Sequence, residues 1–390
     1  MMIKIIPSKL EGNVDIPGSK SLTHRALICA SLSKEKSVII NPLFSEDIKE
    51  TIKILEALGV KFIVTNKFIE VYPPNKLEVI DELVCMESGS TMRFLIPLIS
   101  LLTDKFKIKT SKRMISRINT TDLSDLKGLN FSFDEEYIYV SGKLKNNLFL
   151  SSQITSQWIS GILFILPLKN INLQVDSFGS YTYLTIDVLK AFNVDINYNN
   201  GFIVSGSYKE SNYNVDCDFS SAAFFIAMGV FNNVRINNLS KNSNQPDARI
   251  CDIVNNIDNI TICDMTDSPD IAMLVASIFA VYKGKRTITG LKKLELKESN
   301  RLLAIYEALI YLGADIYLEN DNLIINGKDY LEGNATINSY NDHRVLMSIA
   351  AISSQIKNPF YLTDKDCVNK SLPNFYQLFT SLGGKYEDCL

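Results

Sequence analysis

The stretch Ile48–Val71, which reads IKETIKILEALGVKFIVTNKFIEV, contains a helix-and-strand pattern that recurs along the chain. Apolar residues three and four positions apart predict an amphipathic helix over Ile48–Leu58. Gly59 suits the left-handed conformation in which such helices often end. Short β patterns follow at Val60–Val64 and, after a turn, at Phe68–Val71. The stretch therefore predicts a helix followed by two strands.

The same helix ending, Leu-Gly or a close relative of it, recurs along the chain. Clear copies end the segments Leu123–Leu126, Ile186–Phe192, Leu303–Leu312 and Phe375–Leu382, and a weaker copy lies at Asp252–Ile257. A single ending of this kind is common among helices, so only its regular recurrence indicates an internal repeat.

Helices of a second type alternate with these. They are apolar along most of their length and open with small polar residues, so we expect them to be buried on all sides. They cover His24–Leu32, Ser90–Leu102, Ser152–Leu168, Ser220–Phe231, Pro269–Tyr282 and His343–Ile352. Six copies of each type in 390 residues correspond to about 65 residues per unit, which predicts compact lobes rather than an open array.

The composition excludes several classes of protein. A chain of 390 residues with 46% hydrophobic residues and a net charge of −3 is typical of a globular protein of two or three domains. The near-neutral charge argues against a nucleic-acid partner, and no apolar stretch approaches the roughly 18 residues that span a membrane. Seven cysteines without a C-x-x-C pair are typical of reduced, cytoplasmic proteins, and two histidines offer little for a metal site.

The arginines indicate where anions bind. The chain has only nine, and a guanidinium offers carboxylates and phosphates a planar fork that lysine lacks. A lone arginine is more often a solvated ion-pair partner, but five of the nine lie near helix starts or turns among small and polar residues. These five are Arg25, Arg93, Arg117, Arg301 and Arg344. As a group they predict a distributed anion site.

In the first half of the chain, the segments around these arginines combine cations with small residues. Pro17–Arg25 opens a buried helix, where backbone N–H groups and the helix dipole favour an anion beside Lys20. Ser88–Arg93 repeats this pattern, and Ser151–Gln153 offers hydroxyls and an amide. The same residue types are also ordinary helix caps.

In the second half, acids accompany the cations. Asp264–Asp270, Lys297–Arg301 and Asn341–Arg344 each lead into a predicted helix. A carboxylate held among cations can act as a general acid or base, although acids at helix starts also interact simply with the helix dipole.

Together these segments resemble the EPSP synthase (5-enolpyruvylshikimate-3-phosphate synthase) family. P-G-S-K-S at Pro17–Ser21, K-E-x-x-R at Lys297–Arg301 and N-D-H-R at Asn341–Arg344 are specific in combination. The other matching segments follow the family's order along the whole chain: Ser88–Leu95, Ser151–Gln153, Asp218–Phe225, Ser268–Met273 and Cys367–Pro373.

The resemblance implies an α/β fold of two similar domains. Each domain would contain three βαβαββ-type units as an inside-out α/β barrel, with the active site in the cleft between the domains. Residues 17–216 would form the N-terminal domain, and residues 1–16 would join 217–390 in the C-terminal domain. This division agrees with the six repeats found in the sequence.

The resemblance also implies a reaction. The family transfers the enolpyruvyl group of phosphoenolpyruvate to the 5-hydroxyl of shikimate 3-phosphate and releases phosphate. The reaction passes through a tetrahedral intermediate and belongs to the shikimate pathway to chorismate and aromatic amino acids. No metal and no organic cofactor is implied. The expected partners are these two small molecules, and a cytoplasmic monomer is expected.

The resemblance assigns site residues by position. Shikimate 3-phosphate would be held by Lys20, Ser21, Arg25, Ser151, Ser152, Gln153, Ser180, Asp270 and Lys297. Phosphoenolpyruvate would be held by Lys20, Gly89, Arg117, Gln153, Arg301, His343, Arg344 and Lys370. Asp270 resembles the base for the 5-hydroxyl, and Glu298 resembles the acid that protonates the methylene carbon, with Lys20 assisting.

Four positions depart from the family's usual pattern. Glu87 and Lys293 stand where Asn is usual, Thr185 replaces a common Asp, and Pro246 replaces Gly. None of them removes a residue assigned to the chemistry, but Glu87 puts a carboxylate beside an expected anion site.

Two alternatives stay open. UDP-N-acetylglucosamine enolpyruvyl transferase shares the fold and the donor, but it lacks P-G-S-K-S and often uses a loop cysteine, and none occurs here between Thr110 and Asp122. A non-catalytic anion-binding protein of the same fold would not need acids such as Asp270 and Glu298 among its cations.

Overall fold

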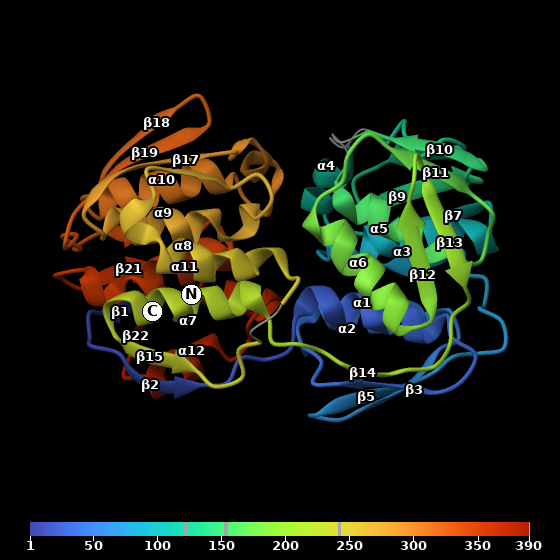
Figure 1. Cartoon of the computed structure of the whole chain (residues 1–390), viewed down its shortest axis with the longest axis horizontal. Coiled ribbons are helices and arrows are strands. Elements are labelled where there is room, and N and C mark those ends of the chain that lie inside the picture. The colour runs from blue at the N-terminus through green and yellow to red at the C-terminus, as the bar shows by residue number, and fades with distance from the viewer. Residues whose placement is uncertain (120–122, 152–154, 241–242, 390) are drawn as a thin grey trace. The chain divides into compact units, whose positions relative to one another are not determined.

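The computed structural model describes residues 1–119, 123–151, 155–240 and 243–389. They form two compact units (Figure 1): the central unit, Gly18–Asp216, and the terminal unit, Met1–Pro17 with Cys217–Leu390. Pro17 lies in the terminal unit, one residue away from the boundary expected from the sequence.

Each unit combines helices with several small sheets. The described helices of the central unit are α1 (Lys20–Ser31), α2 (Glu46–Ala57), α3 (Gly89–Leu102), α4 (Lys112–Asn119), α5 (Ser156–Ile165) and α6 (Ser180–Ala191). Those of the terminal unit are α7 (Phe219–Phe231), α8 (Arg249–Asn255), α9 (Ala272–Ala280), α10 (Arg301–Tyr311), α11 (His343–Ala351) and α12 (Phe375–Ser381).

The sheets of the central unit repeat one topology. The first has the order β14 (Asn212–Asn214), β3 (Ser37–Ile40), β5 (Phe68–Tyr72), β4 (Lys61–Val64), and the second has the order β6 (Glu82–Val84), β7 (Lys105–Lys109), β9 (Tyr137–Gly142), β8 (Leu129–Phe133). In both, the first pair is parallel and the other pairs are antiparallel. The third copy is split into the parallel pair β10 (Asn147–Leu150), β11 (Asn172–Val175) and the antiparallel pair β12 (Val194–Tyr198), β13 (Phe202–Gly206).

The terminal unit repeats this topology with one reduced copy. Its four-stranded sheets have the orders β16 (Ile262–Asp264), β17 (Gly284–Thr289), β19 (Asn322–Gly327), β18 (Asp315–Glu319) and β20 (Thr336–Ile337), β21 (Phe360–Leu362), β1 (Met2–Ile6), β22 (Lys385–Cys389). The third is the parallel pair β2 (Glu11–Val14), β15 (Asn233–Ile236). The described residues of this copy contain no hairpin, because the 3₁₀ turn Ile257–Asn259 leads almost directly into β16, which matches the weaker sequence repeat at Asp252–Ile257.

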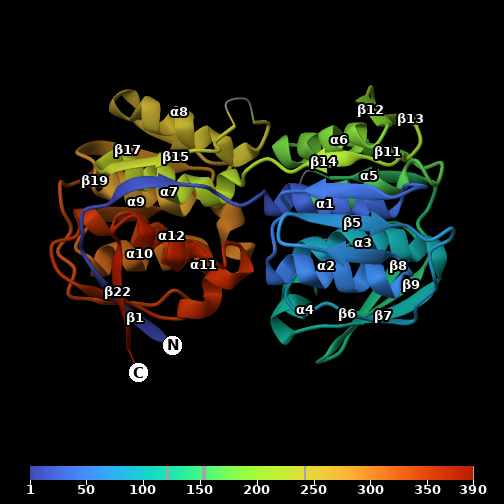
Figure 2. The ribbon, with the colours of Figure 1, turned by 90° about the horizontal axis from the view of Figure 1, so that it is seen from below.

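Two strands pair in one unit although the helix that follows each of them belongs to the other unit. β2 immediately precedes α1 in the sequence, but it pairs with β15 in the terminal unit. Conversely, β14 precedes α7 but pairs with β3, so that Tyr213 lies opposite Ile39. β1 pairs with β22 (Figure 2), with Ile3 opposite Asp388. The chain therefore crosses between the units twice.

Each unit has its own hydrophobic core, formed largely by the helices that are apolar all round. In the central unit α3 packs against α5, and in the terminal unit α11 packs against α9. Ala26 to Ala30 on α1 are fully buried. The alternation of buried and amphipathic helices predicted from the sequence is thereby confirmed. The sheets of the described residues stay open and separate, and none of them closes into a barrel.

The helix endings follow the predicted pattern, with one correction. Gly59, Asn193, Gly313 and Gly383 all have positive φ, as the left-handed ending requires. The helix predicted at Leu123–Leu126 is instead a turn, because four residues are too few to offset the cost of helix nucleation. The second helix of that repeat is α4, in which Met114 and Ile118 are fully buried one turn apart.

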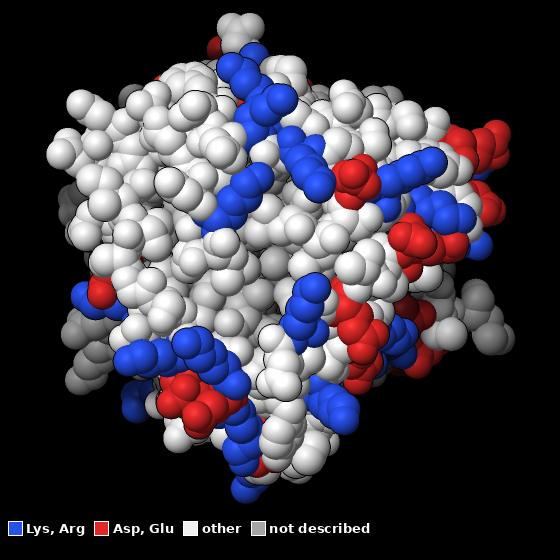
Figure 3. Space-filling view, turned by 90° about the vertical axis from the view of Figure 1, so that its right-hand side faces the viewer, with Lys and Arg blue, Asp and Glu red and all other residues white. Residues whose placement is uncertain are grey.

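No helix in the described ranges is both long enough and apolar enough to cross a bilayer. On the face shown in Figure 3, Lys and Arg alternate with Asp and Glu among wide uncharged areas, so cations form no single basic patch on that face.

Candidate active site

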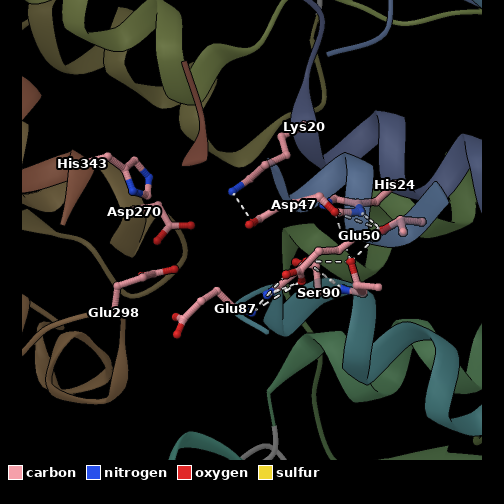
Figure 4. Close-up of polar contacts among 12 residues, drawn as sticks. Lys20, His24, Asp47, Glu50, Glu87, Ser90, Asp270, Glu298 and His343 are labelled. Atoms are coloured by element: carbon pink, nitrogen blue, oxygen red, sulfur yellow. Dashed lines mark hydrogen bonds and ion pairs between the residues drawn. The ribbon is translucent and has the colours of Figure 1, made fainter. Parts of the chain in front are cut away.

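The loop before α1 brings Lys20 to the surface of the central unit. Gly18 fits here because a Cβ would lie only 1.9 Å from the carbonyl oxygen of Asn41. The Ser19 hydroxyl accepts a hydrogen bond from the backbone of Leu22 and caps the helix. Lys20 is the first residue of α1, and its Nζ pairs with Asp47 Oδ2 at 3.1 Å (Figure 4).

Arg25, one turn further along α1, is buried among neutral groups. Its Nε donates to Thr185 Oγ1 at 2.7 Å, and its Nη atoms donate to the carbonyl oxygens of Ser21 and Tyr181 at 2.9 and 3.2 Å. A weaker bond reaches Ser160 Oγ at 3.4 Å. Burial lowers the pKa of Arg25 to about 10. Within the described part of the chain no carboxylate pairs with this guanidinium, which leaves its charge for a bound anion.

The start of α3 lies against two further arginines. A Cβ on Gly89 would lie 2.7 Å from Arg93 Nη1 and 3.3 Å from Arg117 Nη2. Arg93 also donates to Gln157 Oε1 at 2.9 Å and to the carbonyl oxygen of Arg117 at 3.3 Å. Gln157 in turn donates to Ser90 Oγ at 2.8 Å. A side chain at this position would therefore displace the Arg93 guanidinium from its place against the backbone.

The remaining predicted residues of the central unit are partly described. Ser151 donates its backbone N–H to Asp125 Oδ2 at 2.8 Å, and Ser180 is the first residue of α6. Ser152 and Gln153 lie outside the described residues.

The terminal unit brings its predicted cations and acids into one cluster around Arg301, the first residue of α10. Arg301 is 1% exposed. Its guanidinium contacts Glu298 Oε2 at 2.5 Å, Asp342 Oδ2 at 2.8 Å and Asp270 Oδ1 at 2.9 Å. This buried cation therefore has three carboxylate neighbours, whereas Arg25 has none among the described residues.

Asp270 is the carboxylate that the most cations surround. Lys297 Nζ lies 3.3 Å from its Oδ1, Arg344 Nη2 lies 3.6 Å from its Oδ2, and Arg301 contacts it as described. Burial alone would raise its pKa, but Arg344, Lys297 and Arg301 together hold the pKa of Asp270 well below its usual range. Asp270 is thus ionised and ion-paired, and it becomes a stronger base when these cations turn to another anion.

Two further buried acids belong to this cluster, and no sequence motif assigned either of them a role. Asp342 caps α11 by accepting from the backbone of Arg344 at 3.0 Å, and Arg301 holds the pKa of Asp342 low against the effect of burial. Asp247 accepts a hydrogen bond from Ser220 and lies 3.9 Å from Arg344. Burial raises its pKa to about 6 despite that arginine. The N-D-H-R motif was a signal for Asp342, and the altered neighbour Pro246 was the only signal near Asp247.

His343 and Lys370 complete the predicted set. His343 is 2% exposed on the first turn of α11, with Nδ1 3.9 Å from Asp342 Oδ1. Lys370 is the last residue of the 3₁₀ segment Lys365–Lys370. No group of three or more His, Cys, Asp or Glu side chains with the arrangement of a metal site occurs in the described ranges.

Comparisons with known proteins agree on one family. The sequence model of EPSP synthase (3-phosphoshikimate 1-carboxyvinyltransferase) matches residues 5–262 and 258–379. The 3-phosphoshikimate 1-carboxyvinyltransferase of Clostridium beijerinckii is 36% identical over 428 residues, covering 99% of this chain and 98% of the relative. That of Clostridioides difficile is 35% identical over 439 residues, with the same coverage. The solved EPSP synthase from Acinetobacter baumannii covers 99% of both chains with a TM-score of 0.79 at 19% identity, which shows a shared fold.

Proposed function

Because the chain belongs to the EPSP synthase family and is therefore a transferase, we propose that it joins phosphoenolpyruvate to shikimate 3-phosphate with Lys20, Asp270 and Glu298 as catalytic groups. The observation that carries the assignment of these roles is the cluster around Arg301, where two of the three groups contact one buried guanidinium. A protein that only bound anions would gain nothing from acids that compete for its cations.

Shikimate 3-phosphate binds to the central unit in this proposal, with contributions from the terminal unit. Arg25 supports this role because its described hydrogen-bond partners are all neutral, so its charge is available to the 3-phosphate. The proposed ligands also include Lys20, Ser21, Ser151, Ser152, Gln153, Ser180, Asp270 and Lys297.

Phosphoenolpyruvate carries a phosphate and a carboxylate, and its proposed ligands are correspondingly cationic. They are Lys20, Gly89, Arg117, Gln153, Arg301, His343, Arg344 and Lys370. Arg344 and Arg301 both pair with Asp270. When they turn toward the substrate anion, they release Asp270, whose pKa then rises toward that of a useful base. Binding of the donor therefore prepares the base for the acceptor.

The reaction proceeds by addition and elimination. Glu298, assisted by Lys20, gives a proton to the methylene carbon of phosphoenolpyruvate, and Asp270 removes the proton of the 5-hydroxyl as its oxygen bonds to C2 of the donor. In the second step the new methyl group loses a proton, the bond from C2 to the phosphate oxygen breaks, and phosphate leaves. The enol ether is restored, and no metal or organic cofactor takes part in this scheme.

We further propose that the helices and sheets form the inside-out barrels of the family and that the active site lies in the cleft between the two units. Cations contributed by both units repel one another until substrate anions bind, which favours closure with both substrates present. Superimposable scattering profiles with and without both substrates would rule closure out. The proposal includes a cytoplasmic monomer, for which the scattered cysteines give the compartment argument.

The test is release of phosphate from phosphoenolpyruvate with each of two acceptors. We expect release with shikimate 3-phosphate and none with UDP-N-acetylglucosamine. Release only with UDP-N-acetylglucosamine would contradict the proposed acceptor, and release with neither would favour the anion-binding alternative.

A further inference from the structure

Helix α2 carries no residue assigned to either substrate, yet its first turns reach both substrate-binding segments of the central unit. Asp47 pairs with Lys20 at 3.1 Å, and Glu50, three residues later, contacts the loop before α3 (Figure 4). α2 therefore links the catalytic lysine to the segment that presents Gly89.

The Glu50 carboxylate accepts several hydrogen bonds from that loop. The backbone N–H groups of Met86 and Ser88 each donate to it at 3.0 Å, that of Glu87 at 3.3 and 3.4 Å, and the Cys85 thiol at 3.3 Å. Three successive N–H groups directed at one point form the kind of concave site that usually binds an anion. Here the protein fills that site with its own carboxylate.

This arrangement bears on the sequence pattern at Ser88–Arg93, whose small residues suggested that backbone N–H groups approach a substrate anion. The first N–H group of that segment, at Ser88, donates to Glu50, as do those of the two residues before it. Glu50 on α2 thus fixes the loop. The guanidinium groups of Arg93 and Arg117 lie against Gly89 at the end of the loop.

Hydroxyl groups next to Glu50 also connect α2 with the start of α3. Thr51 Oγ1 lies 2.6 Å from Thr91 Oγ1 on α3, which lies 2.6 Å from Ser88 Oγ. On the other side Thr51 lies 2.7 Å from Nδ1 of His24 on α1. Burial, with Lys20 and Arg25 nearby, holds the pKa of His24 well below its ordinary value, so the ring is neutral and the chain of hydrogen bonds carries no added charge.

We propose that Glu50 is a positioning residue for phosphoenolpyruvate: its carboxylate fixes the Cys85–Ser88 loop so that Gly89 stays against Arg117. This inference rests on the proposed function, which places Gly89 and Arg117 at the donor site. Among the described contacts, Glu50 reaches the proposed shikimate 3-phosphate site only through α2. Loss of the Glu50 carboxylate should therefore raise KM for phosphoenolpyruvate more than KM for shikimate 3-phosphate.

The test is Glu50→Gln, which keeps the shape of the side chain but turns an amide N–H₂ toward backbone donors. We expect KM for phosphoenolpyruvate to rise about 10-fold, the effect of losing one or two hydrogen bonds to a charged group. KM for shikimate 3-phosphate should change less than about twofold, because the Glu50 carboxylate bonds to the Cys85–Ser88 loop and to no residue proposed for that substrate among the described residues. Glu46→Gln is the matched control, because Glu46 is exposed on the same helix and pairs only with Lys49 at 2.7 Å among the described residues.

Glu50→Asp serves if Glu50→Gln does not fold, because it keeps the charge but shortens its reach; a smaller rise in the same KM is then expected. Equal changes in both KM values, or lower thermal stability with unchanged KM for phosphoenolpyruvate, would show a merely structural role and overturn the inference. Failure of the proposed function is distinguished by the wild type. If the wild-type protein neither releases phosphate nor binds phosphoenolpyruvate in calorimetry, both proposals fall.

Discussion

Two buried arginines, Arg25 in the central unit and Arg301 in the terminal unit, have opposite surroundings. Arg25 in the central unit bonds only to neutral oxygens among the described residues, whereas Arg301 in the terminal unit contacts three carboxylates. An uncompensated buried cation is suited to holding a substrate anion. A cluster in which several acids share a few cations is suited to moving protons. Any change in the partners of the cations alters the pKa values of the acids. This contrast supports the proposal that the central unit mainly binds shikimate 3-phosphate and that the terminal unit supplies two of the three catalytic groups.

The largest effect should come from the acid that the terminal unit surrounds with cations. Asp270→Asn should lower kcat by roughly 10²- to 10⁴-fold, the usual contribution of a general base. Substrate affinity should be retained, because Arg301, Lys297 and Arg344 lose a competing carboxylate. Steady-state phosphate release measures both quantities. If affinity fell while kcat persisted, Asp270 would act only as a ligand of shikimate 3-phosphate and not as the base.

The second effect concerns the uncompensated cation of the central unit. Arg25→Lys keeps a positive charge but loses the planar fork, so KM for shikimate 3-phosphate should rise about 10- to 100-fold. The value of kcat should change little. Thr185→Val is the control for local packing, since it keeps the guanidinium but removes the 2.7 Å acceptor of Arg25 Nε together with the bonds of Thr185 Oγ1 to Ser160 and Tyr181. A control variant as impaired as Arg25→Lys would mean that packing, and not the guanidinium, accounts for the loss.

A smaller effect is expected at the contact between Gly89 and its arginines. In Gly89→Ala the new Cβ would lie 2.7 Å from Arg93 Nη1, so the guanidinium groups must shift. We expect KM for phosphoenolpyruvate to rise about 10-fold, in line with the loss of a charge-assisted hydrogen bond. The KM for shikimate 3-phosphate is the internal reference, and an equal rise in both constants would contradict the assignment of Gly89 to the donor.

The smallest effect is a pH dependence of stability within the terminal unit. Burial raises the pKa of Asp247 from 3.8 to about 6, so between these values the folded state binds more protons than the unfolded state. The contribution of Asp247 is therefore present at low pH and is lost as pH rises toward 6. Relative to the wild type, Asp247→Asn should gain stability over this range in urea unfolding. A difference that does not vary with pH would show that Asp247 does not titrate there.

Much of this molecule follows from local sequence patterns. The helix endings, the buried helices and the arginines at helix starts are encoded within a few residues, and the family indicated by the motifs is confirmed. The fold predicted from these patterns is confirmed as a mixed α/β structure of repeated sheets and helices like that of a solved EPSP synthase.

The ion-pair network was less accessible from the sequence. Arg301 contacts Asp270 and Asp342, which lie 31 and 41 residues away along the chain. No local pattern pairs such residues, because their contact depends on how three helix starts converge. The Glu50 contact with the loop before α3 is hidden in the same way, since it joins positions 36 to 38 residues apart.

One assay of two variants tests most directly whether Arg25 in the central unit serves binding and Asp270 in the terminal unit serves catalysis. Phosphate release by Arg25→Lys and Asp270→Asn is measured over a range of both substrates. We predict a raised KM for shikimate 3-phosphate with kcat retained in the first variant, and a lowered kcat with KM retained in the second. The same kinetic pattern in both variants would contradict this prediction.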